Sequence, residues 1–141
     1  MKVFFDTNVC VAEALLGEMA EQIIEVTERA SWRIYSSTYL LDELQRVLVE
    51  KLGFSRRLAV LSRGRVARRA KLVEPGASRH AVPKDPADSP ILRAALTAGV
   101  DYLVTNDTHL LALDPYEGLR IISMNAYCER LREEGYLEIE E

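Results

Sequence analysis

Short apolar runs alternate along the chain with longer segments in which apolar residues recur every three or four positions. The short runs are typical of strands buried on both faces, and they occupy Val3–Phe5, Arg33–Tyr35, Leu72–Val73, Asp101–Thr105 and Leu119–Ile122. The longer segments predict helices over 10–30 (with a break at Gly17), 39–52, 55–70, 89–98, 108–112 and 123–134. Strands that alternate with helices predict an α/β fold, with a parallel sheet covered by helices on both faces.

Length and composition indicate a globular protein. The chain has 141 residues, 48% of them hydrophobic, which predicts one domain over residues 1–141 with a substantial core. Its apolar runs are too short to span a bilayer, and its start lacks the apolar core of a signal peptide. We therefore expect a cytoplasmic protein that does not associate with membranes. The two cysteines, Cys10 and Cys128, are expected to be buried thiols.

Two aspartates directly follow predicted strands. Asp6 ends the first run, and Asp107 follows the fourth run by two residues. The carboxyl ends of parallel strands form the edge at which open α/β sheets bind ligands. Carboxylates gathered there repel one another unless they are protonated or bridged by a cation. The pattern therefore indicates a divalent metal and chemistry on phosphates.

The helical periodicity adds two more acids to this edge. Glu43 borders the apolar stripe of helix 39–52, whereas Asp42 points toward solvent. Asp88 falls on the inner face of the helix that follows Pro90. Each acid also has a structural alternative: Glu43 could pair with a cation on its own helix, and the three aspartates could cap helices or form turns. His109 is expected to be a surface histidine.

The net charge is −4, but positive charge is concentrated in one predicted helix. No acid occurs between Ser55 and Leu72. The arginines that could contact RNA there are Arg56, Arg57, Arg63, Arg65, Arg68 and Arg69. A solvated helix face and a docking surface for an acidic protein partner remain open as alternatives.

With these residues placed, the chain resembles the PIN (PilT N-terminus) domain family, and within it the nuclease toxins of type II, VapBC-like toxin–antitoxin modules. The motifs that carry the resemblance are Phe5–Val9, Leu41–Leu44, Asp85–Leu92 and Ala98–Asp107. The resemblance implies a three-layer α/β/α sandwich around a five-stranded parallel sheet. It also implies a metal-dependent ribonuclease that is often homodimeric and is often held inactive by a small antitoxin protein.

The resemblance also implies roles for particular residues. It assigns metal binding and catalysis to Asp6, Glu43, Asp88 and Asp107. It assigns supporting roles to Asn8, Thr105 and Asp85. These hard oxygen ligands favour one or two Mg²⁺ or Mn²⁺ ions, and a metal-activated water would attack the phosphodiester. Two alternatives remain: a structure-specific DNA nuclease, and a non-catalytic PIN-like domain that regulates or binds proteins.

Overall fold

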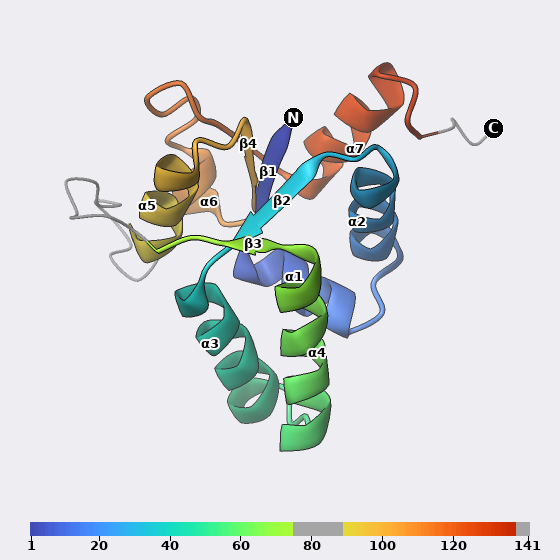
Figure 1. Ribbon diagram of the computed structural model, residues 1–141, viewed down its shortest axis with the longest axis vertical. Helices are drawn as coiled ribbons and strands as arrows, with labels where there is room; N and C mark the ends of the chain where they lie inside the picture. Colours follow the sequence, from blue (N-terminus) through green and yellow to red (C-terminus); the bar gives the residue numbers. More distant parts are fainter. Residues whose placement is uncertain (75–88, 138–141) are drawn as a thin grey trace.

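The central feature of the computed structural model, which describes residues 1–74 and 89–137, is a five-stranded parallel sheet in the order β3-β2-β1-β4-β5 (Figure 1). The strands are β1 (Lys2–Phe5), β2 (Arg33–Ser36), β3 (Lys71–Leu72), β4 (Tyr102–Val104) and β5 (Arg120–Ile122). The predicted α/β class and parallel sheet are therefore confirmed. The third strand begins one residue earlier than its apolar run predicts.

β1 occupies the middle of the sheet. Val3 is in register with Ile34 of β2 on one side and with Tyr102 of β4 on the other. Val3 and Phe4 are completely buried, because helices cover both faces of a parallel sheet of this kind. This central place explains why β1 reads as a continuous apolar run, and it puts the residue after β1 at the centre of the carboxyl edge.

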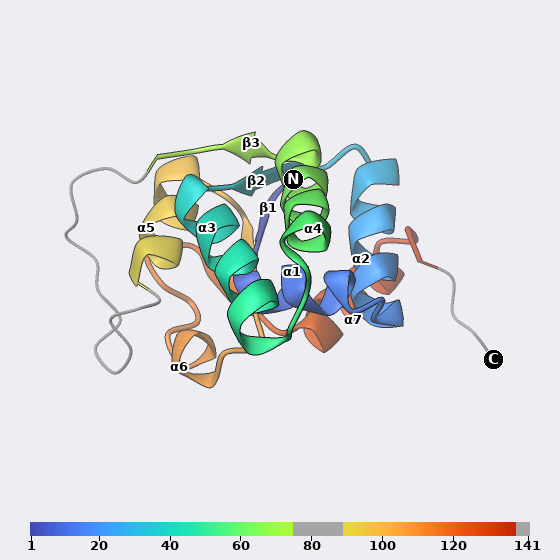
Figure 2. The ribbon, with the colours of Figure 1, turned by 90° about the horizontal axis from the view of Figure 1, so that it is seen from below.

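Helices flank the sheet on two sides. They are α1 (Thr7–Ala14), α2 (Glu18–Arg29), α3 (Thr38–Arg46), η1 (Val47–Lys51), α4 (Arg56–Arg69), α5 (Ser89–Ala98), α6 (Thr108–Leu111) and α7 (Met124–Glu133). Figures 1 and 2 both show α5 and α6 on one side of the strands and α2 and α7 on the other. No helix in the described part of the chain is both long enough and apolar enough to cross a membrane.

The predicted helix 10–30 is two helices that meet at Gly17, as the break predicted. The first of them begins earlier than expected, at Thr7, because the Asp6 carboxylate caps it by accepting a hydrogen bond from the Thr7 amide. Side-chain caps also start α3 at Ser37, α4 at Ser55 and α7 at Ser123.

The predicted helix 39–52 changes from α-helix to π-helix part of the way along. Its first part is α3, and its last turn, η1, is a π-helix. Short π-helical turns inside α-helices are found disproportionately at functional sites. α3, η1 and α4 form a helical hairpin that extends away from the sheet at the bottom of Figure 1. The two cysteines are buried free thiols, as predicted.

Candidate active site

A pocket of about 280 Å³ lies at the carboxyl edge of the sheet. Its lining residues come from the end of β1, from α1, from the α3–η1 helix and from the start of α6: Asp6, Thr7, Asn8, Val11, Glu43, Val47 and Asp107. Three of the four acids predicted from the sequence therefore share one pocket. The fourth, Asp88, and the supporting candidate Asp85 lie outside the described residues.

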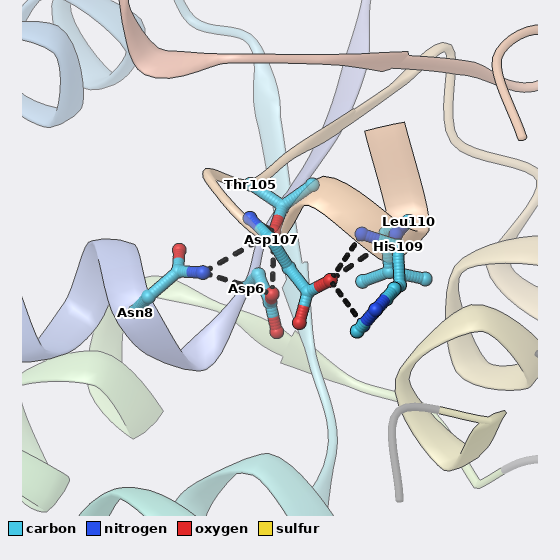
Figure 3. A network of polar contacts seen from close by, with 6 residues as sticks. All are labelled: Asp6, Asn8, Thr105, Asp107, His109 and Leu110. Carbon is cyan, nitrogen blue, oxygen red and sulfur yellow. Dashed lines mark hydrogen bonds and ion pairs between the residues drawn. The ribbon is translucent and has the colours of Figure 1, made fainter. Parts of the chain in front are cut away.

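Asp6 is the most buried acid of the pocket, with 3% of its surface exposed. Its Oδ1 atom accepts a hydrogen bond from the Thr7 amide at 2.7 Å. Its Oδ2 atom accepts one from the Thr105 hydroxyl at 2.7 Å and a longer one from the Asn8 amide at 3.4 Å (Figure 3). Both carboxylate oxygens are thus held in place, so the capping role and the pocket role of Asp6 coexist.

Thr105 links the two aspartates. Its Oγ1 atom donates to Asp6 and accepts hydrogen bonds from the Asp107 amide at 3.0 Å and from Asn8 Nδ2 at 3.3 Å. Thr105 is completely buried. Asn8 Oδ1 in turn accepts from the Asn106 amide at 3.4 Å. Asn8 and Thr105, the two residues predicted to support the acids, therefore connect the end of β4 to the start of α1.

Asp107 caps α6. Its Oδ1 atom accepts hydrogen bonds from the amides of His109, at 2.7 Å, and Leu110, at 3.2 Å. The His109 ring is exposed, as predicted, and its Nδ1 atom lies 3.8 Å from the same oxygen. As with Asp6, the helix cap and the position at the pocket occur in one residue.

The pocket is electrostatically unfavourable for the Asp6 carboxylate. The pKa of Asp6 is raised from 3.8 to about 6, mainly by burial and to a smaller extent by the negative charges of Glu43 and Asp107. The hydrogen bonds from Thr105 and Thr7 lower the pKa but do not offset the burial. A pocket with these properties favours either a proton or a cation beside Asp6.

Glu43 reaches the pocket from α3, whereas its neighbour does not. Glu43 is partly buried and lines the cavity. The Asp42 side chain is 64% exposed and accepts a hydrogen bond from Arg63 at 2.7 Å. Arg46, one of the cations that could have paired with Glu43, lies 3.7 Å from Glu50 instead. The helical phase predicted from the sequence therefore separates these two acids correctly.

The oxygen donors around the pocket suit a hard cation by chemical type, since its lining residues include no cysteine or histidine. Within residues 1–74 and 89–137, no three acid, histidine or cysteine side chains converge closely enough to hold a metal ion without rearrangement. The pocket also contains a residue that the sequence did not indicate. The Thr7 hydroxyl is buried and has no hydrogen-bond partner among the described residues, which leaves it available to a ligand.

The arginine-rich helix α4 differs from its predicted role at one position. The Arg69 side chain is only 8% exposed, and its guanidinium donates two hydrogen bonds to the Glu13 carboxylate, at 2.6 and 2.7 Å. Glu13 belongs to α1 and is equally buried. Arg69 is therefore engaged inside the fold, and we remove it from the residues expected to contact RNA.

Comparison with known proteins gives a family match and two solved structures with a similar fold. A family model described as the PIN domain matches residues 2–109. VapBC2 from Rickettsia felis, solved bound to a DNA fragment from its promoter, superposes with a TM-score of 0.66 and 17% identity, over 87% of this chain and 98% of that one. PAE2754 from Pyrobaculum aerophilum superposes with a TM-score of 0.64 and 21% identity, over 94% of this chain and 90% of that one. No curated protein sequence matches the chain.

Proposed function

Because the chain belongs to the PIN domain family, we propose that it is a metal-dependent ribonuclease and the toxin of a toxin–antitoxin pair. The observation that carries the proposal is the pocket in which Asp6, Glu43 and Asp107 face one cavity at the carboxyl edge of the sheet. The raised pKa of Asp6, about 6, supports it, because a cation would relieve the repulsion that helps to raise this value.

Asp6, Glu43 and Asp107, with Asp88, are the residues proposed to hold one or two Mg²⁺ or Mn²⁺ ions. A bound ion of this kind lowers the pKa of a water molecule and neutralises charge that develops on the phosphodiester. Asp85 is proposed as a supporting acid. The two aspartates of the described pocket are already oriented by the backbone, through the Thr7 amide for Asp6 and the His109 amide for Asp107.

The remaining polar residues are proposed to position Asp6. Thr105 and Asn8 both donate to Oδ2 of Asp6, so they hold this carboxylate in one orientation and favour its ionised form. A pre-oriented ligand does not need to reorganise during the reaction. The Thr7 hydroxyl is proposed to bind substrate or an ordered water, since it is buried in the pocket lining without a partner.

The expected partners are an RNA substrate, a small antitoxin and a second copy of the chain, and the expected location is the cytoplasm. The fold shared with VapBC2 supports the toxin–antitoxin assignment. A DNA nuclease is the competing enzyme, since metal–carboxylate sites cleave both polymers. A non-catalytic PIN-like domain is less consistent with three acids retained in one pocket.

Cleavage of total RNA tests the function directly. Wild-type protein with Mg²⁺ or Mn²⁺ is expected to cut RNA, whereas protein in EDTA and the Asp6→Asn variant are expected to leave it intact. The matched control is Asp42→Asn, which changes an exposed neighbouring aspartate and should cut normally. Single-stranded and duplex DNA of matched sequence form the other arm. Full activity of pure, folded Asp6→Asn protein would refute the site assignment, and preferential cutting of DNA would refute the substrate.

A further inference from the structure

The outward face of α4 combines exposed leucines with arginines. Leu58 and Leu61 are 53% and 56% exposed. Arg65 and Arg68 are also exposed. Residues three, four and seven positions apart share one face of a helix, so Leu58, Leu61, Arg65 and Arg68 form a continuous stripe. We call these four residues, together with Gly64 between them, the α4 stripe.

The positive charge of the α4 stripe is not neutralised within the described chain. Arg65 and Arg68 form no ion pair with any acid in residues 1–74 and 89–137, and the same holds for Arg56 and Arg57 on the same helix. By contrast, Arg63 and Arg69 are partly buried and are paired with Asp42 and Glu13, respectively. The arginines of α4 without an ion pair are therefore the exposed ones.

Gly64 lies in the middle of this face. Its backbone is ordinary α-helix, so no unusual dihedral angle requires a glycine. Glycine in an exposed helix interior costs about 1 kcal/mol relative to alanine. A Cβ atom at this position would meet Arg68 Nη1 at 3.0 Å and Arg68 Cζ at 3.9 Å, both at the end of a flexible side chain. The end of the Arg68 side chain therefore lies beside the Gly64 backbone, which has no side chain of its own to keep another helix away.

We propose that the α4 stripe is a docking surface for an acidic amphipathic helix of a protein partner. Its leucines would pack against the apolar face of that helix, Gly64 would allow close contact, and the arginines would pair with flanking carboxylates. The proposal rests on the toxin–antitoxin part of the proposed function for the existence of a partner, and it names the surface and the chemistry of that partner.

RNA is the competing occupant, and the exposed leucines distinguish the two. A surface that binds phosphates needs cations and polar donors, with aromatic rings where bases stack. The α4 stripe has no aromatic residue, and two of its five members are exposed leucines. Water would be displaced from these leucines by a partner's apolar side chains, but not by a phosphate backbone.

Fluorescence anisotropy can separate the two occupants. The probes are a labelled helical peptide of about 20 residues with leucines on one face and glutamates elsewhere, the same peptide with lysines for glutamates, and a single-stranded RNA of similar length. All measurements are made in EDTA, so that binding is independent of cleavage. We expect the acidic peptide to bind and the basic peptide not to bind. Leu61→Asp should weaken binding of the acidic peptide by about tenfold or more, and Arg65→Glu should act in the same direction.

Matched variants control for non-specific effects. Met19→Asp changes an exposed apolar residue on α2, and Arg33→Glu reverses an exposed charge on β2; both should leave peptide binding unchanged. No saturable peptide binding, or equal binding by Leu61→Asp and wild type, would overturn the proposal. RNA binding that requires Arg65 but not Leu61, without peptide binding, would assign the stripe to RNA. Since no step requires catalysis, failure of RNA cleavage leaves this result interpretable.

Discussion

The Asp6→Asn variant should be more stable than the wild type at neutral pH when no metal is present. The folded protein raises the pKa of Asp6 from 3.8 to about 6, so the folded state binds this proton more tightly than the unfolded state. Stability therefore falls as pH rises from about 4 to about 6. Above that range the ionised carboxylate costs the folded state about 3 kcal/mol, at 1.36 kcal/mol per pH unit. Asparagine carries no charge and avoids this cost.

The substitution also removes one hydrogen-bond acceptor from the site. The carboxylate accepts from Thr7 on one oxygen and from Thr105 on the other, and an amide can accept on one oxygen only. The lost bond costs about 1 kcal/mol. The net effect is then about 2 kcal/mol of added stability near pH 7.5. Near pH 4.5, where Asp6 is largely protonated in the folded state, the two effects roughly cancel.

Urea denaturation in EDTA, followed by the fluorescence of Trp32, measures this difference. Trp32 is the single tryptophan of the chain and is 7% exposed. Asp42→Asn is the control, because an exposed ion pair contributes about 1 kcal/mol or less, and its effect should change little with pH. A stability difference for Asp6→Asn that is constant between pH 4.5 and pH 7.5, or a variant less stable at the higher pH, would refute the reasoning. Added Mn²⁺ should stabilise the wild type more than the variant.

Three further substitutions test other parts of the molecule. Thr105→Val should leave the fold intact but reduce RNA cleavage at least about tenfold and shift the pH–rate profile upward, because Asp6 loses the hydrogen bond that lowers its pKa. Arg69→Met should lower the free energy of unfolding, measured by urea denaturation, by about 3–5 kcal/mol, because it leaves the buried Glu13 charge without a partner. Adding Glu13→Gln to this variant should recover much of the loss. Ser37→Ala should cost about 1 kcal/mol of stability, because it removes the side-chain cap of α3.

Features determined by local periodicity were predictable from the sequence. Asp6 and Asp107 follow buried strands, and strand ends share an edge in any parallel sheet. The choice of Glu43 over Asp42 needed only the phase of one helix, and the pocket lining and the Arg63 contact agree with it. In each case the relevant information lies within one element and its immediate neighbour in the chain.

Features that depend on contacts between distant elements were not predictable in this way. Arg69 is one of several similar arginines in sequence, and its partner Glu13 is 56 positions away. Only the packing of α4 near α1 distinguishes it from Arg65 or Arg68. The π-helical turn that carries Val47 to the pocket had no signal in an otherwise regular apolar stripe. The orphaned Thr7 hydroxyl likewise becomes visible only with its surroundings.

Helix α1 contacts both the pocket and α4, and so fixes the pocket and the α4 stripe relative to each other. Its first turn supplies Thr7 and Asn8 to the pocket, and its last turn supplies Glu13 to the buried pair with Arg69. Eight residues of helix span about 12 Å, so the pair anchors the end of α4 close to the acids. α3 carries Glu43 to the pocket and packs against both α4 and α1. The buried pair therefore helps to hold α4 against α1, and α4 in turn supports the helix that carries Glu43.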